Sequence, residues 1–253
     1  MSEPLVPTPP AAPGEPEPAA AGGFFQNLVD VYFSPREAFT RIARRPAFLL
    51  PLLGHLVLTA AFSGYWMSKM EPREFMKTQL EESGQWDKIP AEQREVILDN
   101  AGSQMKIFGW IGTVFVPIMV LVIAAVLMLI YRFFYASEVG FKQSFAIVAW
   151  VFFAVALVST PLLLLVFGLK GDWNLNPQDV VQANLSLLLD KASAAKPLWA
   201  LLSSIDLFSF WMLFLLATGF GAASRKPTSA ALWGVAVPWA IIILCKVGWA
   251  AIF

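Results

Sequence analysis

The chain of 253 residues has very few of the side chains on which metal and thiol chemistry depend. It contains one cysteine, Cys245, and one histidine, His55, and each lies inside an apolar run. One cysteine allows no disulfide within the chain, and one histidine excludes two-histidine metal sites. No nucleophile, base and orienting group can be assembled from the remaining residues. We therefore expect no catalytic residue, no metal, no cofactor and no enzymatic activity.

Charged side chains are also scarce. They make up 14% of the residues, with 18 basic and 18 acidic groups that give a net charge of zero. No basic stretch is long enough to follow a nucleic-acid backbone, so nucleic acid is not an expected partner. In contrast, 57% of the residues are hydrophobic and the mean hydropathy is +0.62, which lies beyond the range of soluble domains. The composition predicts an integral membrane protein surrounded by the lipid bilayer.

Several apolar stretches are long enough to cross a membrane, since a bilayer core about 30 Å thick requires roughly 20 helical residues. They cover residues 47–67, 107–130, 144–169, 199–222 and 229–253. Four of them contain a proline, which membrane helices tolerate. The sequence therefore predicts an all-α fold, a polytopic membrane helix bundle with five transmembrane helices that occupies residues 24–253.

The first 23 residues have a different composition, rich in proline and alanine. They lack the charged region followed by an apolar core that marks a secretory signal. Such a segment buries too little apolar surface to offset the entropy lost on ordering. We expect residues 1–23 to form a disordered cytoplasmic tail.

Basic residues flank the predicted spans unevenly. The flanks on one side of the membrane hold Arg36, Arg41, Arg44, Arg45, Arg132, Lys142, Arg225 and Lys226. In the opposite loops, residues 68–106 and 170–198, basic residues are balanced or outnumbered by acidic ones. By the positive-inside rule, the N-terminus is predicted to lie in the cytoplasm and the C-terminus outside the cell membrane.

The segment VYFSPREAFTRIARRP, residues 31–46, precedes the first span and has the signals of a helix start. The Ser34 hydroxyl can cap the first free N–H groups, Pro35 fits the first helical position, and Glu37 can complete a capping box. Apolar residues such as Phe39 would share one side of this helix. The segment predicts a short amphipathic pre-membrane helix that lies among the lipid headgroups.

The arginines of this segment, Arg36, Arg41, Arg44 and Arg45, allow two interpretations. Each basic residue near an anionic membrane surface adds about 1 kcal/mol of attraction, which favours contacts with anionic lipids. Alternatively, the arginines only set the orientation of the first span.

Asp206 and Lys246 are charged residues inside the last two predicted spans. Each lies twenty positions from residue 226, the centre of the intervening turn, so both are expected roughly 10 Å below the outer surface. An ionised group within a bilayer costs on the order of 3 kcal/mol, and the two charges are therefore predicted to pair. The pair could be an ion or proton site, or it could fix the register of the two helices. Small residues such as Gly219 and Gly234 are expected to let these two helices approach closely.

Three segments resemble the Yip1 domain family: VYFSPREAFTRIARRP before the first span, FKQSFAIVAW at the start of the third, and SSIDLFSFWMLFLLATGFG in the fourth. The resemblance covers residues 25–253 and implies five spans with a cytoplasmic N-terminus. Eukaryotic members are implicated in traffic between endoplasmic reticulum and Golgi through prenylated Rab GTPases. The Asp-Leu-Tyr-Gly-Pro motif of the Golgi members is absent, and the tail and short loops are more similar to the prokaryotic branch.

Two functions follow from these observations. The first is a non-enzymatic membrane protein that acts through lipid contacts, or through an unidentified membrane or cytoplasmic protein partner, in membrane organisation or trafficking-like processes. The alternative is a small-solute or ion transporter that uses Asp206 and Lys246, with prolines marking broken helices. The odd number of spans and the lack of a visible internal repeat argue against transport.

Overall fold

The structure is a computed structural model that describes residues 23–181, 183–189 and 194–252. Within these ranges the regular elements are helices, together with one isolated bridge between Asn184 and Asp206. Almost all of the tail that the sequence predicts to be disordered, residues 1–23, lies outside the described residues.

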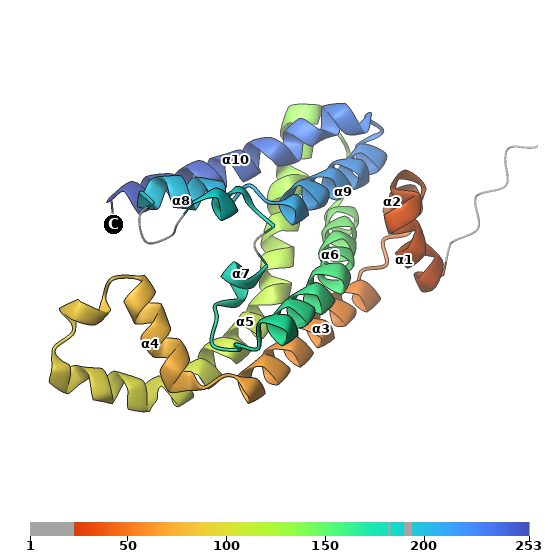
Figure 1. The fold of residues 1–253 in the computed structure, drawn as a ribbon. Helices are drawn as coiled ribbons and strands as arrows, with labels where there is room; N and C mark the ends of the chain where they lie inside the picture. Colours follow the sequence, from red (N-terminus) through yellow and green to blue (C-terminus); the bar gives the residue numbers. More distant parts are fainter. Residues whose placement is uncertain (1–22, 182, 190–193, 253) are drawn as a thin grey trace, which may run out of the picture.

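Five helices are long and apolar enough to cross a membrane, which confirms the all-α fold and the number of spans. They are α3 (Leu49–Lys69), α5 (Ala91–Tyr135), α6 (Phe141–Lys170), α9 (Leu207–Ser224) and α10 (Thr228–Ile252). Figure 1 shows α9 and α10 running antiparallel, with α6 between them and α3.

Helix α5 is much longer than a membrane is thick. Its 45 residues extend about 68 Å, against about 30 Å for a hydrocarbon core. Its first turns pack against α4 (Pro72–Glu82), where Phe75, Leu98 and Ala101 are buried. The guanidinium of Arg94 also lies over the ring of Trp86, in the short turn η1 (Trp86–Lys88). This helical arm is the yellow part of the ribbon in Figure 1.

The fourth predicted span is not one continuous helix, so this part of the prediction is wrong. The chain forms α8 (Lys196–Leu202), breaks at residues 203–206, and then starts α9. The hydroxyl of Ser204 donates to the carbonyl of Ala200 at 2.7 Å, and the Asp206 carboxylate accepts the N–H of Ser209 at 2.9 Å. Short polar side chains of this kind compete with the helical backbone and favour a new helix start. A hydropathy count does not detect such a break.

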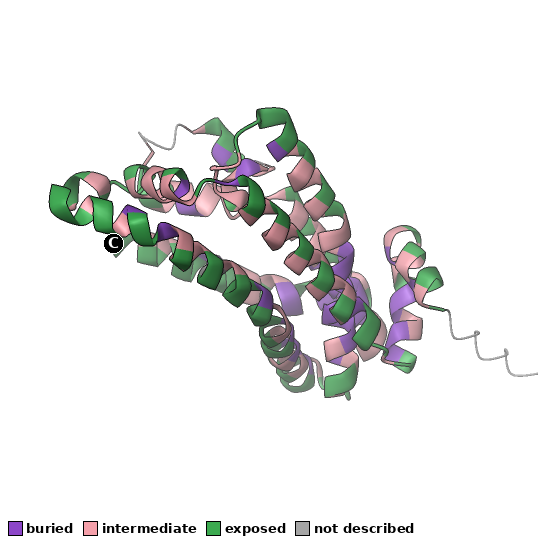
Figure 2. Ribbon diagram, turned by 90° about the horizontal axis from the view of Figure 1, so that it is seen from below, coloured by how far each residue is buried: buried purple, intermediate pink, exposed green. Residues whose placement is uncertain are grey.

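The core of the bundle lies toward one end. Its largest buried side chains include Phe39, Tyr131, Trp150 and Phe220, and the rings of Tyr131 and Phe220 stack with centroids 4.6 Å apart. In Figure 2 the buried residues are densest close to α1 and α2. Away from this end, the α9–α10 hairpin separates from α3 and α6, and α7 (Pro177–Val180) lies between them (Figure 1).

Two short helices, α1 (Phe24–Phe33) and α2 (Pro35–Arg44), complete the core. Helix α2 packs against α9 and α6. A Cβ added at Gly219 would lie 2.4 Å from Cγ2 of Ile147 and 3.2 Å from Cδ1 of Phe39. Gly219 therefore makes room for α2 and α6, whereas the sequence analysis assigned it to the contact between α9 and α10. Gly234 likewise accommodates the ring of Tyr131 on α5.

Candidate functional site: a basic pocket beside α2

The pre-membrane segment is tied into the bundle by polar contacts. The Nε of Arg41 donates to Oδ1 of Asn27 at 3.1 Å, and its guanidinium forms an ion pair with Asp30. The hydroxyl of Tyr32 donates to the carbonyl of Ala154 on α6 at 2.8 Å. Burial raises the pKa of the Tyr32 phenol further above neutral pH, where a tyrosine hydroxyl is already protonated and can donate. The Arg41 contacts thus join α2 to α1, and the Tyr32 hydrogen bond holds α1 against α6.

The start of α2 differs in part from the sequence prediction. Helix α2 begins at Pro35 as predicted, but the Ser34 hydroxyl makes no capping hydrogen bond. Instead, the backbone of Ser34 forms hydrogen bonds with both short helices. Its N–H donates to the carbonyl of Asp30 in α1, and its carbonyl accepts hydrogen bonds from the N–H groups of Glu37 and Ala38 in α2. The predicted capping box is therefore wrong, because Ser34 also ends α1.

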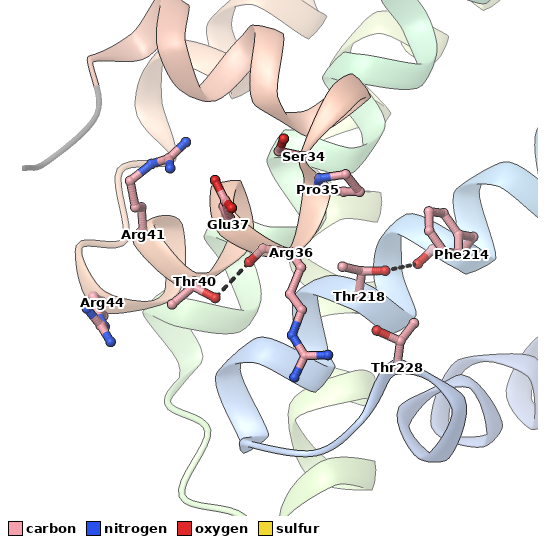
Figure 3. A pocket seen from close by; sticks show the side chains of 10 residues that line it. All are labelled: Ser34, Pro35, Arg36, Glu37, Thr40, Arg41, Arg44, Phe214, Thr218 and Thr228. Atoms are coloured by element: carbon pink, nitrogen blue, oxygen red, sulfur yellow. Dashed lines mark hydrogen bonds between the residues drawn. The ribbon is translucent and has the colours of Figure 1, made fainter. Parts of the chain in front are cut away.

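A pocket of about 650 Å³ lies between α2 and the α9–α10 hairpin. Its lining comes from Ser34, Pro35, Arg36, Glu37, Thr40, Arg41, Arg44, Phe214, Thr218 and Thr228. Figure 3 shows that Arg36 extends toward Thr228, whereas Arg41 points to the opposite side. The pocket therefore joins residues that lie almost two hundred positions apart in the sequence.

The charge in this pocket comes mainly from Arg36 and Arg44. Both arginines are exposed, and neither belongs to an ion pair among the described residues. Spaced by eight positions, they share one face of α2 with Thr40, whose hydroxyl donates to the carbonyl of Arg36 at 2.7 Å. Glu37 is the acidic group in the lining, and its place in the first turn of α2 suits the helix dipole.

The α9–α10 turn extends the basic surface. Arg225 and Lys226 are exposed there, next to the Thr228 that lines the pocket. Arg225 adopts a left-handed conformation, with φ of 57°, which ends α9 and reverses the chain. We refer to the end of the bundle that carries α2 and this turn as the basic end.

The arginines that the sequence predicts to contact anionic lipid have different environments in the structure. Arg36 and Arg44 line the pocket. Arg45 is exposed just after α2, outside the pocket lining, and Arg41 is committed to Asp30. The contribution of α9 and α10 to the pocket, through Phe214, Thr218 and Thr228, was not predicted from the sequence. The only signal for it was the second group of basic residues in the last turn, which shares the predicted side of the membrane.

Comparison with known proteins assigns the chain to a family. The model of the Yip1 domain matches residues 29–250. The chain belongs to the Yip1 domain family. The match begins within α1 and ends within α10, so all residues lining the basic pocket lie inside the Yip1 domain. No curated protein and no solved structure matches the chain.

The Yip1 domain places the charges of its last two spans near each other without a direct ion pair. Among the described residues, the Lys246 amine donates to the hydroxyls of Ser204 at 2.9 Å and Ser203 at 3.4 Å. The Asp206 carboxylate caps α9 through the N–H and hydroxyl of Ser209. Both sets of contacts lie at the polar break between α8 and α9, and a function for the two charges stays a prediction.

The length of α9 bears on the cost of these two charges. Helix α9 has 18 residues and is about 27 Å long, close to the thickness of a hydrocarbon core. Asp206 precedes α9, at the end of the helix opposite the basic end. The depth of Asp206 and Lys246 in a membrane stays a prediction.

The scarce metal-binding side chains are dispersed in the Yip1 domain. In the part of the chain that the structure describes, no three His, Cys, Asp or Glu residues lie close enough to hold a metal ion. His55 lies on α3 against the ring of Phe152, with centroids 6.0 Å apart, and Cys245 is exposed on α10. The basic pocket thus remains the candidate site with the most developed geometry.

Proposed function

We propose that this integral membrane protein is non-enzymatic and acts through lipid and protein contacts at its basic end, in membrane organisation or trafficking-like processes. The observation that carries the proposal is the pocket beside α2, where Arg36 and Arg44 are exposed and outside any ion pair of the described residues. Two cationic side chains on a face held rigidly by α6 and α9 form a preorganised surface for an anionic partner.

The basic end is proposed to face the cytoplasm, with the N-terminus inside and the C-terminus outside a cell membrane. The support is the agreement between the positive-inside rule and the packing of α2, which lies against α9 and brings its arginines to the end that holds Arg225 and Lys226. Five spans leave the two termini on opposite sides.

Anionic lipids of the cytoplasmic leaflet are the proposed ligands of Arg36, Arg44 and Arg45. Each basic residue at such a surface contributes about 1 kcal/mol. Arg41 is not included, because its guanidinium is paired with Asp30 and its side chain is only 14% exposed. If these arginines bind no lipid, they only set the orientation of the first span in the membrane.

Lipid enrichment around the reconstituted full chain tests this proposal. The variant R36Q/R44Q/R45Q is expected to lose at least tenfold of the preference for anionic over neutral phospholipid, as follows from the loss of about 3 kcal/mol of attraction. The control K88Q/K106Q removes two positive charges in η1 and α5, away from the basic end, and should keep the preference. Equal enrichment in wild type and R36Q/R44Q/R45Q would reject lipid contact and leave only an orienting role.

A protein partner is the other contact included in this proposal. Purification of the full chain in lipid, followed by identification of what copurifies, tests it. A partner that is recovered with the wild type and lost with R36Q/R44Q/R45Q supports a docking role for the basic end. Equal recovery with both proteins excludes these arginines from that role.

Transport is the second candidate, and one observation favours it. A cavity of about 330 Å³ between α6 and the α8–α9 break has polar residues in its lining, among them Thr160, Asn184 and Asp206. Solute flux into proteoliposomes tests this function. The variant D206N/K246Q should abolish a flux that depends on the two charges, and a flux that survives removes their proposed role.

A further inference from the structure

We propose that the basic pocket binds the phosphodiester of one anionic phospholipid, with an acyl chain of that lipid lying along Phe214. The inference rests on the proposed function, because it takes the basic end to face the cytoplasmic leaflet. It adds a discrete site, with one lipid per chain, to the diffuse attraction between surface arginines and anionic headgroups.

The polar end of the pocket has the chemistry that a phosphodiester requires. Arg36 extends toward Thr228 (Figure 3), so its guanidinium and the threonine hydroxyl face the same space. Arginine binds phosphate oxygens through a planar fork of N–H donors. Thr228 is also the first residue of α10, whose first N–H groups add positive potential. We assign the phosphate to this end of the pocket.

The depth of the pocket indicates a lipid and not a free phosphate ion. Its lining continues from Thr228 along α9 to Thr218 and Phe214. Phe214 lies ten residues before Ser224, the last residue of α9, and hence about 15 Å from the basic end. Phe214 is 48% exposed. A ligand with a phosphate at one end and a hydrocarbon chain at the other fills both parts.

Glu37 is the acidic residue of the lining, and its negative charge disfavours a headgroup with several negative charges. In Figure 3 its carboxylate points away from the Arg36 guanidinium, so it does not contact the phosphate assigned there. A phosphodiester with a single negative charge, as in phosphatidylglycerol, matches the one guanidinium at this end of the pocket. Arg44, at the far end of α2, provides additional attraction without direct contact to the phosphate.

Native mass spectrometry of the full chain, released from bilayers of phosphatidylcholine and phosphatidylglycerol, tests the site. The wild type is expected to retain one phosphatidylglycerol per chain. R36Q should reduce this retention about tenfold or more, whereas K142Q, which removes an exposed charge at the basic end outside the pocket, should leave it unchanged. The lysine variant R36K keeps the charge without the fork and should give an intermediate value.

Several outcomes overturn the discrete site. Equal losses in R36Q and K142Q would mean diffuse attraction only, in which case the site fails and the proposed function stands. A wild type without any preference for phosphatidylglycerol rejects both the discrete site and the lipid contact of the proposed function. If inorganic phosphate displaces the lipid and F214A retains as much phosphatidylglycerol as the wild type, the pocket is assigned to a free phosphate ion. If an acidic peptide of a protein partner displaces the lipid and F214A again retains as much as the wild type, the pocket is assigned to a protein ligand.

A second readout keeps the proposal testable if R36Q lowers the stability of the chain. A photoreactive phenylalanine analogue at position 214 should crosslink to the acyl chain of phosphatidylglycerol in the otherwise unaltered protein. Crosslinking to phosphatidylcholine in equal yield would show that Phe214 contacts bulk lipid, which contradicts the assignment.

Discussion

Arg36 and Arg41 lie five positions apart on the same short helix and have different environments. The guanidinium of Arg41 turns toward α1, where Asp30 and Asn27 bind it, whereas Arg36 extends into the pocket beside Thr228. Their positions around α2 decide the difference. Five residues do not make a whole number of helical turns, so the two side chains leave the helix on different faces. At the residue scale, the structure engages Arg41 with Asp30 and places Arg36 in the pocket, outside the ion pairs of the described residues.

The ion pair between Arg41 and Asp30 is expected to stabilise the pre-membrane segment. Both R41Q and D30N should lower the free energy of unfolding by about 1–3 kcal/mol, since each leaves a partly buried charge without its partner. Thermal unfolding of the chain in lipid nanodiscs measures this, with R44Q, which has no such partner, as the control. Equal melting temperatures in all four proteins would contradict the role of the pair.

Gly219 is predicted to be intolerant of even one methyl group. Because an added Cβ would meet Ile147 at 2.4 Å, G219A should cost about 1–3 kcal/mol through overpacking. At Gly248 nothing lies within 4 Å of an added Cβ, so G248A should unfold at or above the wild-type temperature. If the two variants melt together, α2 and α6 do not pack on α9 as described.

At the scale of single elements, α1 has two distinct faces. Its inward face carries Val31, which is fully buried, and Tyr32. Its outward face carries Phe25, Val29 and Phe33, with exposed fractions of 78%, 53% and 82%. The spacing of four residues aligns these three side chains in one stripe. An apolar stripe beside exposed arginines is the pattern of a helix that lies in a membrane interface.

Spin labels along α1 test whether the stripe contacts lipid. In a chain with C245A, labels introduced by F25C, V29C and F33C should be accessible to oxygen and protected from a water-soluble nickel complex. The label of Q26C, on an exposed polar position, should show the opposite preference. Equal nickel accessibility at all four positions would place α1 in water, away from the membrane.

At the scale of the whole molecule, the helices meet at the basic end and diverge toward the other end, with α7 between them (Figure 1). In Figure 2 buried residues gather close to α1 and α2, at the basic end. The opposite end carries the arm of α4 and α5, where Arg73 forms ion pairs with Glu95 and Asp99. The molecule thus has one closely packed basic end and one more open end with polar breaks.

The orientation of the whole chain gives a further prediction. In a background with C245A, K88C in the arm should react with a membrane-impermeant maleimide on intact cells. R225C in the α9–α10 turn should react only after permeabilisation. The reverse pattern would contradict the proposed orientation, and labelling of both positions in intact cells would contradict the separation of the two ends by the membrane.

The sequence by itself determined the fold class, the five spans and the family, because each depends on length, hydropathy and local motifs. It could not determine how the helices face one another. Gly219 illustrates the limit: its small size predicted a close helix contact, but only the packing showed that α2 and α6 make it. Helix periodicity fixes the face of a residue and leaves its partner open.

The tertiary structure alone decided which charges are available. It paired Arg41 with Asp30, linked Lys246 to Ser203 and Ser204, and joined Arg36 to Thr228 in one pocket. Each of these outcomes depends on residues between 11 and 192 positions apart. Side-chain contacts over such distances are set by how the helices pack, and the order of residues along the chain does not encode them directly.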